Sequence, residues 1–238
     1  MGNFKERKFY ESGGFVRRLG QRCFSSNLNI NDNSCVGLKE LMKINKNTRH
    51  FNNKLIHIVS DPEVLVLSYK ITKSQPGNLI LGSDLISLDK SSLDWFTKTG
   101  KLLKAGKYKF KLARRVYITK LGKINFNKLL IISGFKDKII QQTIYLVLNV
   151  IYEPSFLDVF YGSRPNRGNH SALKYIKFNF NGVKWCINTD IENNFLSIFH
   201  KILLNILKKR IGCSKFIMLV KKFVKVSFKN KKKVYQSN

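Results

Sequence analysis

The chain has 238 residues, of which 44 are Lys or Arg and 14 are Asp or Glu, so its formal net charge is +30. Because 43% of the residues are hydrophobic and 12% are aromatic, the composition excludes a wholly disordered chain and predicts one or two domains with a core. A compact chain of this charge needs abundant counter-charge, so we expect a polyanionic partner, with nucleic-acid phosphates favoured over small acidic substrates.

The first 35 residues are polar and basic, and we expect them to form a flexible leader. Residues 14–26 (GFVRRLGQRCFSS) contain Arg and Ser and no acidic residue, as is typical of mitochondrial presequences. An ordinary basic leader on an organelle-encoded protein is the alternative interpretation. Both interpretations indicate an organelle, most simply the mitochondrion.

Three helices are predicted in the first half of the chain. Residues 36–51 place apolar side chains near helical spacing among basic ones, which predicts an amphipathic helix with a basic outer face. A second helix is expected over residues 62–73, with Asp61 as its cap and Pro62 as its first residue. The third spans residues 91–106 and ends at Gly106.

The middle of the chain changes to short β-prone runs and then to a long helix. Residues 115–119 and 129–132, separated by a turn at Gly122, predict a hairpin. Residues 136–152 place six large aliphatic side chains on one broad face, which predicts a buried helix that Pro154 closes. The six are Ile139, Ile140, Ile144, Val147, Leu148 and Ile151.

The last third alternates between helix and strand. We expect a short helix over residues 171–178, a strand over 183–191 with Trp185 in the core, and a helix over 195–210. Four side chains of that last helix are expected to point inward, namely Ile198, Ile202, Leu203 and Ile206. Residues 215–233 predict a basic helix that runs into a Lys-rich loop. No run of 18 apolar residues exists, so no membrane-spanning helix is expected.

Two features carry candidate chemistry. Asp190 lies at the end of the predicted strand and precedes a helix, a place where a carboxylate can hold a divalent metal ion against phosphate, although a helix cap is the alternative. Some twenty residues earlier, the loop around Arg164 and Arg167 can present guanidinium groups to phosphate or to a template strand.

These residues also resemble a known family. Gly162-Ser163-Arg164-Pro165, followed by Arg167, His170, Ala172 and Leu173, is similar to the G-F-R-P-x-R-x-x-H-x-A-L block of group II intron reverse transcriptases, the maturase proteins of bacterial and organellar introns. Residues 190–195 (DIENNF) resemble the first catalytic block of that family. Residues 114–120 (RRVYITK) and 136–142 (KDKIIQQ) resemble the block ahead of it, so three blocks stand in family order.

The resemblance implies an α/β (α+β) fold, namely reverse-transcriptase fingers and an incomplete palm, mostly helical with short antiparallel strands. Residues 36–113 would form an N-terminal helical finger region, and residues 114–238 would form the fingers and partial palm. By the same resemblance, Asp190 would bind Mg²⁺, Lys120 would contact nucleotide phosphate, and Phe195 would exclude the wrong sugar. Arg164 and Arg167 would position template or nucleotide.

The sequence departs from the family pattern at several positions. Ser163 replaces the aromatic residue of G-F-R-P, Thr119 replaces a proline, and Leu196 replaces an aspartate. No Tyr/Phe-x-Asp-Asp motif is present, so the second pair of carboxylates for two-metal chemistry is missing. We therefore expect a truncated chain that does not polymerise alone, and a complementary fragment could supply the rest of the palm.

Three hypotheses on function follow. The first is a protein related to group II intron reverse transcriptases and maturases that acts on or binds intron RNA, with DNA as a further ligand. The second is a non-catalytic RNA-binding splicing factor that binds through basic helices at residues 38–49 and 215–225. The third is a non-functional remnant. Whether the chain is an enzyme stays open at this point.

Overall fold

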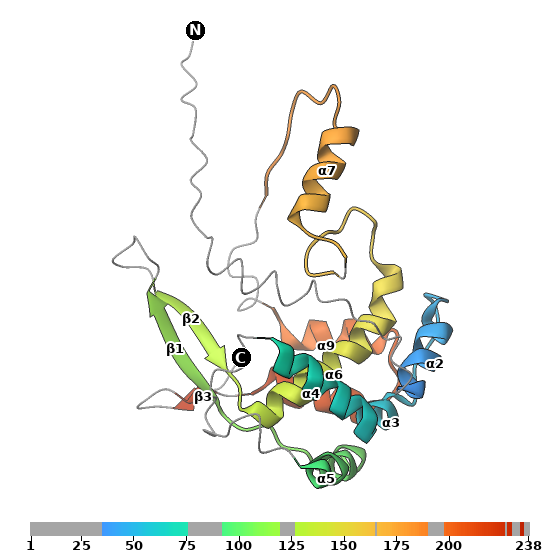
Figure 1. The fold of residues 1–238 in the computed structure, drawn as a ribbon, viewed down its shortest axis with the longest axis vertical. Coiled ribbons are helices and arrows are strands. Elements are labelled where there is room, and N and C mark those ends of the chain that lie inside the picture. Colours follow the sequence, from blue (N-terminus) through green and yellow to red (C-terminus); the bar gives the residue numbers. More distant parts are fainter. Residues whose placement is uncertain are drawn as a thin grey trace. The chain divides into compact units, whose positions relative to one another are not determined.

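The computed structural model describes residues 35–75, 92–119, 127–164, 166–189, 198–226, 228–229 and 234–235 (Figure 1). The chain divides into two compact units, which are described separately. The helical unit includes Asn29–Leu157 and Val183–Asn238, and the loop unit includes Asp158–Gly182. Apart from Cys35, the predicted leader lies outside the described residues.

Helix α6 (Phe135–Tyr152) is the centre of the helical unit and packs against α2 (Val36–Asn45), α3 (Leu55–Val59) and α4 (Pro62–Ser74) (Figure 1). Its long apolar face, predicted from the sequence, is confirmed. The fully buried members of that face are Ile139, Ile140, Val147 and Ile151, and Ile144 is nearly so. Burial of such side chains stabilises the fold by about 1.5–3 kcal/mol each.

Helix α4 begins as the sequence predicts. An Asp61 carboxylate oxygen accepts a hydrogen bond from the Glu63 N–H at 3.0 Å, and Pro62 occupies the first turn, where its missing N–H costs nothing. Farther along, the buried hydroxyls of Ser68 and Thr143 are 2.8 Å apart and join α4 to α6 by a hydrogen bond. A polar pair thereby fixes the register of two otherwise apolar helix faces.

Helix α5 (Leu93–Lys104) lies within the predicted range 91–106 and crosses close to the end of α3. Gly100 makes this approach possible, because a Cβ at that position would overlap the backbone oxygen of Ser60. Gly106 follows the helix with φ of +70°, a conformation that glycine adopts without strain and that ends helices.

Helix α2 ends at Asn45, which is six residues earlier than predicted. The reason is a buried amide pair: Asn45 and Asn52 donate to each other's side-chain oxygens at 3.0 Å, and Asn45 also donates to the Leu41 carbonyl at 2.9 Å. This pair folds the chain back after the helix. The short helix α3 that follows was not predicted.

The predicted hairpin is confirmed. Strands β1 (Ala113–Thr119) and β2 (Asn127–Ile132) pair antiparallel, with Arg114 opposite Ile132 and Thr119 opposite Asn127. Strand β3 (Phe228–Lys229) pairs parallel to β1, and β4 (Val234–Tyr235) pairs antiparallel to β3. The sheet order is therefore β2-β1-β3-β4. The predicted turn at Gly122 lies outside the described residues.

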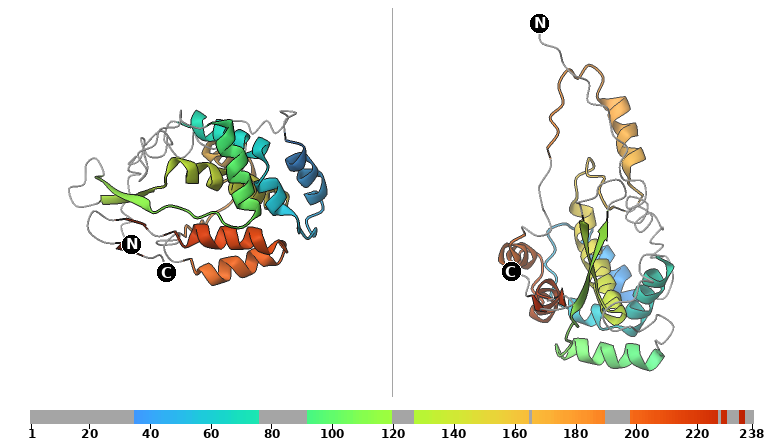
Figure 2. Two further views of the ribbon diagram at one scale, coloured as in Figure 1. Left: turned by 90° about the horizontal axis from the view of Figure 1, so that it is seen from below. Right: turned by 90° about the vertical axis from the view of Figure 1, so that its left-hand side faces the viewer.

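Helices α9 (His200–Lys208) and α10 (Ser214–Val224) lie side by side (Figure 2). The inward face that the sequence predicted for the helix over residues 195–210, observed as α9, was wrong. Leu204 and Leu207 are the buried residues of α9, whereas three of the four predicted residues are at least 40% exposed, namely Ile198, Ile202 and Ile206. Helix α10 buries Phe216, Ile217, Leu219 and Val220. It exposes Lys215 and Lys221, whereas Lys222 is half-buried.

The predicted strand over residues 183–191 is wrong for its described part. Residues 183–189 form neither helix nor strand and are all exposed, and Trp185, expected in the core, is 89% exposed. A strand needs a neighbouring strand for its backbone N–H and C=O groups. No described strand pairs with this segment.

The loop unit contains helix α7 (Asn169–Asn179), which confirms and slightly extends the predicted helix over residues 171–178. None of its side chains is buried. In the helical unit, the 3-10 turn η3 (Glu153–Ser155) contains Pro154 and terminates α6, as predicted. None of the described helices has both the length and the apolar character that crossing a membrane requires.

Candidate nucleic-acid interface

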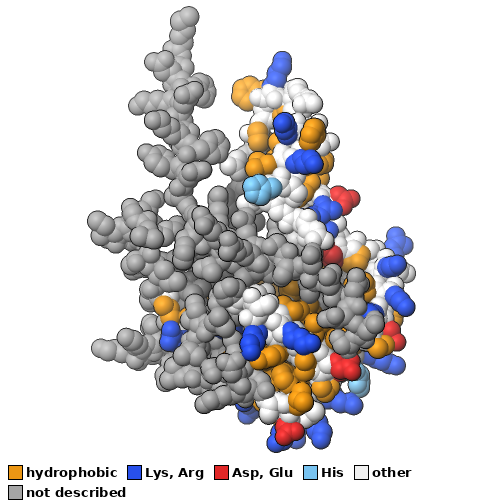
Figure 3. Space-filling model, in the orientation of Figure 1, with side chains coloured by type: hydrophobic (Ala, Val, Ile, Leu, Met, Phe, Trp, Pro, Cys, Tyr) orange, Lys and Arg blue, Asp and Glu red, His pale blue; other side chains and the backbone are white. Residues whose placement is uncertain are grey.

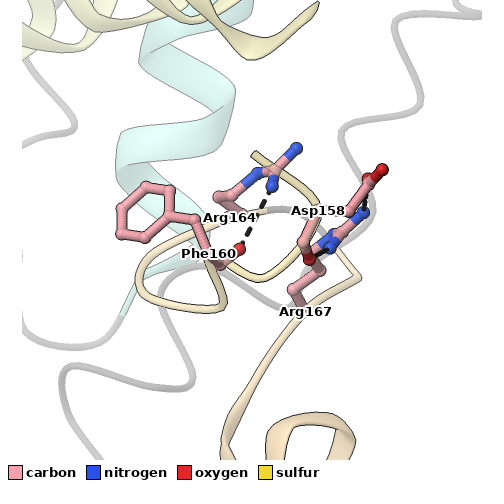
Figure 4. A network of polar contacts seen from close by, with 4 residues as sticks. All are labelled: Asp158, Phe160, Arg164 and Arg167. Carbon is pink, nitrogen blue, oxygen red and sulfur yellow. Dashed lines mark hydrogen bonds and ion pairs between the residues drawn. The ribbon is translucent and has the colours of Figure 1, made fainter. Parts of the chain in front are cut away.

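Arg164 is held inside the loop that precedes α7. Its Nη1 donates a hydrogen bond to the Phe160 carbonyl at 3.1 Å, and its guanidinium carbon lies 6.0 Å from the centre of the Phe160 ring (Figure 4). The residue is only 6% exposed. Arg164 therefore shapes its own loop, and the surface it offers to a ligand is small.

Arg167 is more accessible and is paired with an acid. Its Nη2 lies 2.9 Å from an Asp158 carboxylate oxygen, and Nη1 donates to the Asp158 backbone carbonyl (Figure 4). The guanidinium carbon lies 5.6 Å from the centre of the Tyr161 ring. The side chain of Arg167 is 28% exposed and that of Asp158 is 96% exposed, so solvent screens the ion pair.

The backbone around these arginines is unusual. Ser163 and Asn166, one on each side of Arg164, have φ of 55° and 57°. Asparagine tolerates this left-handed conformation, whereas serine adopts it less readily. Helix α7 begins two residues after Arg167, where the Gly168 N–H donates to the Ser171 hydroxyl at 2.8 Å. The two left-handed residues redirect the backbone on either side of Arg164, and the Gly168–Ser171 hydrogen bond fixes the start of α7 just after Arg167.

The predicted site residues do not all fall in the described part of the chain. Arg164 and Arg167 lie three residues apart on one loop. Lys120, Asp190 and Phe195 lie outside the described residues. Within the residues that the structure covers, no group of three or more His, Cys, Asp or Glu side chains is placed to hold a metal ion. The predicted metal site at Asp190 therefore stays a prediction.

On the described part of the face in Figure 3, Lys and Arg side chains are scattered over the surface and acidic side chains are fewer. Of the two helices predicted to bind RNA, α2 and the turn after it expose Lys43, Lys46 and Arg49. Helix α10 exposes Lys215, Lys221 and Lys225. Both helices thus present cations without burying them, as a phosphate-binding surface requires.

Another arginine, which sequence reasoning missed, has a structural role. Arg210 donates to the Asn45 side-chain oxygen at 3.3 Å and to the Ser155 hydroxyl at 3.4 Å, and it lies 5.1 Å from the centre of the Tyr152 ring. Burial raises the pKa of the Tyr152 hydroxyl above its ordinary value, and the positive charge of Arg210 opposes this rise. No sequence motif marks Arg210, because its partners come from two segments far from it in the sequence, at Asn45 and at residues 152–155.

Comparison with known proteins finds similarity to proteins whose names refer to introns. It is 30% identical over 207 residues to the COX1/OXI3 intron 1 protein of Saccharomyces cerevisiae, covering 86% of this chain and 25% of that protein. It is 32% identical over 192 residues to the group II intron-encoded protein LtrA of Lactococcus lactis, which covers 79% of this chain and 32% of that protein. It is 28% identical over 95 residues to nuclear intron maturase 4, mitochondrial, of Arabidopsis thaliana, which covers 40% of this chain and 12% of that protein.

The aligned regions are parts of longer proteins. The chain spans about a quarter of the length of the first curated relatives that it matches. No protein-family model matches the chain.

Proposed function

We propose that the chain belongs to the family of group II intron-encoded reverse transcriptases and maturases and that it binds group II intron RNA as the fingers and part of the palm of such a protein. The observation that carries this proposal is the similarity over 207 residues, 86% of the chain. The net charge of +30 supports it, because phosphate neutralisation supplies much of the affinity for nucleic acids. DNA is a further ligand in this proposal.

Arg167 is the residue of the loop unit that we assign to RNA. A guanidinium has five N–H donors in a planar fork, and two Arg167 nitrogens contact Asp158. The pair is solvent-screened, so a phosphate can compete with the Asp158 carboxylate for the guanidinium. Arg164 is assigned to hold the loop in shape, and through the loop it positions template or nucleotide.

The family implies use of a divalent metal ion, and we assign Mg²⁺ to Asp190. Lys120 would contact the phosphate of a bound nucleotide, and Phe195 would contact its sugar. A bound Mg²⁺ would supply charge stabilisation at phosphate oxygens. This set is a proposal that rests on family resemblance, because the three residues lie outside the described part of the chain.

We place the protein in the mitochondrion. Relatives include a mitochondrial maturase of Arabidopsis thaliana, and the basic segment at residues 14–26 supports an organellar site. Other relatives are bacterial, such as LtrA, so this placement rests on the basic segment together with the mitochondrial relatives.

Three single substitutions test the role of Arg167 in RNA binding. Arg167→Ala removes the guanidinium, Asp158→Ala removes only its acidic partner, and Lys177→Ala removes one exposed positive charge from α7 of the same unit. The affinity of each variant for a group II intron RNA is measured by filter binding at fixed salt.

If Arg167 contacts RNA, we expect Arg167→Ala to weaken binding about tenfold, the size of one charge-assisted contact. Asp158→Ala should then preserve or strengthen binding, and Lys177→Ala should change it by less than twofold. If Arg167→Ala and Asp158→Ala weaken binding equally, Arg167 serves only to hold the loop, and its assignment to RNA is wrong.

A further inference from the structure

A basic groove lies in the helical unit, between residues 107–112 and the C-terminal half of α10. Its volume is about 480 Å³. Five lysines and four apolar residues line it, and no acidic residue does. The lysines are Lys109, Lys111, Lys221, Lys222 and Lys225, and the apolar residues are Phe110, Leu112, Met218 and Val226. We call this feature the lysine groove.

One wall of the groove is a short extended segment with alternating side chains. Lys109 and Lys111 are exposed, whereas Tyr108 and Phe110, which alternate with them, are half-buried. Side chains alternate between the two sides of an extended segment, so the aromatic rings point toward the protein and the ammonium groups point toward solvent. Phe110 anchors the segment to α10, because its ring centre lies 5.8 Å from that of Phe223.

A buried carboxylate fixes the backbone of the same wall. Asp137, in the first turn of α6, is 3% exposed. One of its oxygens accepts a hydrogen bond from the Tyr108 hydroxyl at 2.7 Å, and the other accepts from the Lys111 N–H at 2.9 Å. The wall is therefore preformed, and a ligand would not have to order it.

The opposite wall is α10. Lys221 and Lys225 are four residues apart, so they lie on one face of the helix, and both are exposed. Lys222 has a different role: its Nζ donates to the Gly106 carbonyl at 2.7 Å and to the Tyr108 carbonyl at 3.2 Å, which ties the two walls together. Four exposed lysines thus face a groove that a fifth helps to hold in shape.

These four ammonium groups have no acidic counterpart within the described part of the chain. Neither Lys109 nor Lys111 pairs there with a carboxylate, and the same is true of Lys221 and Lys225. Like charges held in one groove repel one another, and a bound polyanion relieves that repulsion. The charge therefore points to a ligand with several phosphates in succession.

The apolar residues of the lining, which we call the floor of the groove, distinguish among polyanionic ligands. Met218 is 56% exposed and Leu112 is 38% exposed, so the floor offers open apolar surface between the lysines. A duplex presents phosphates outward and keeps its bases stacked inside, whereas a single strand can place a base on an apolar or aromatic surface. A flat anionic membrane would meet the rim of a concave site and leave its floor uncovered.

We propose that the lysine groove binds a single-stranded segment of RNA, with the lysines on successive phosphates and an unpaired base on the floor. The choice of RNA over DNA rests on the proposed function. The residues that line the groove are not those of the Arg167 loop or of the family motifs, so the proposal assigns a role to lysines that no motif marks.

The test uses the 238-residue chain and a fluorescently labelled, unstructured RNA oligonucleotide, with binding followed by anisotropy over a salt series. The groove variant is Lys111→Ala/Lys225→Ala, one change on each wall. The matched control is Lys98→Ala/Lys101→Ala, which removes the same charge from exposed positions of α5. Thermal unfolding of each variant verifies that the fold is intact.

We expect the groove variant to lose about tenfold in affinity at low salt and its salt slope to fall by about 1.4, or roughly 0.7 for each lost phosphate contact. The control should lose less than twofold. Met218→Ala should weaken single-strand binding about threefold with no change in slope, because it removes apolar contact and no charge. Binding of a duplex RNA should be insensitive to Met218→Ala.

Equal losses in the groove variant and the control would overturn the proposal, since only overall charge would then matter. It would also be overturned if the groove variant lost binding to anionic vesicles and kept binding to RNA. Failure of the proposed function has a different signature: the groove variant would still lose single-strand affinity, while the unmodified chain would show no preference for intron RNA over unrelated RNA.

Discussion

Asp137→Ala should destabilise the helical unit and disorganise the lysine groove at once. The Asp137 carboxylate is buried and accepts hydrogen bonds from Tyr108 and Lys111, both on the wall formed by residues 107–112. Alanine removes both acceptor oxygens, so the Tyr108 hydroxyl and the Lys111 N–H must hydrogen-bond to water instead. It also removes a negative charge from the first turn of α6, where the helix dipole favours one.

The magnitude follows from these contacts. A hydrogen bond to a charged group contributes about 1.5–3 kcal/mol, and the dipole interaction contributes about 0.3–1 kcal/mol. Because both donors are only partly buried, water recovers some of the loss. We therefore expect a decrease of about 3 kcal/mol in the free energy of unfolding, which corresponds to a Tm roughly 6–12 °C lower for a chain of this size.

Urea unfolding followed by circular dichroism measures the change. The free energy of unfolding of Asp137→Asn should lie between those of the unmodified chain and of Asp137→Ala. The asparagine amide keeps one acceptor oxygen but turns a donor toward one of the two partners. The control is Asp94→Ala, which removes an exposed acid from the first turn of α5 and should cost less than about 0.5 kcal/mol. If Asp137→Ala costs no more than Asp94→Ala, the carboxylate does not hold the wall, and the preformed groove loses its basis.

Four further outcomes are expected. Gly100→Ala should destabilise the protein by about 1–3 kcal/mol in urea unfolding, because its methyl group would overlap the Ser60 carbonyl oxygen and push α5 away from α3. Asp61→Ala should cost about 1 kcal/mol in the same assay through loss of the α4 cap; an unchanged midpoint would mean that the cap is dispensable. Burial raises the pKa of Tyr152 above 10.0, so the folded state keeps this proton to higher pH than the unfolded chain does, and stability should fall as pH rises above about 10. Tyr152→Phe should reduce that fall and remove one late-titrating component of the tyrosinate absorbance. Since the 238 residues contain no Tyr/Phe-x-Asp-Asp motif, primer extension by this chain alone should be absent, and any templated product would refute that expectation.

Elements fixed by local chemistry could be predicted from the sequence. The Asp61-Pro62 pair defines the start of α4 within two residues, and the broad aliphatic face of α6 allows only one buried side. Helix α9 could not be oriented in this way. Its sequence HKILLNILK has apolar residues on more than one face, so packing in three dimensions decides that Leu204 and Leu207 are buried while Ile202 is exposed.

The site was only partly predictable for a related reason. Arg164 and Arg167 lie in one short motif, and the sequence alone singles them out. The lysine groove joins residues 107–112 to α10, and 114 positions separate Tyr108 from Lys222, which touch across it. Charge runs are common in a chain of +30, so only the fold distinguishes these lysines from the rest.

The central claim is that the chain recognises group II intron RNA, and the most direct test compares its affinity for such an intron with that for an unrelated RNA of equal length, over a salt series. Counterion release weakens both complexes as salt rises, but specific contacts persist. We predict tighter binding to the intron and a preference that survives at high salt. Equal affinities that fall in parallel for both RNAs would contradict the claim and leave only the charge of the chain to account for binding.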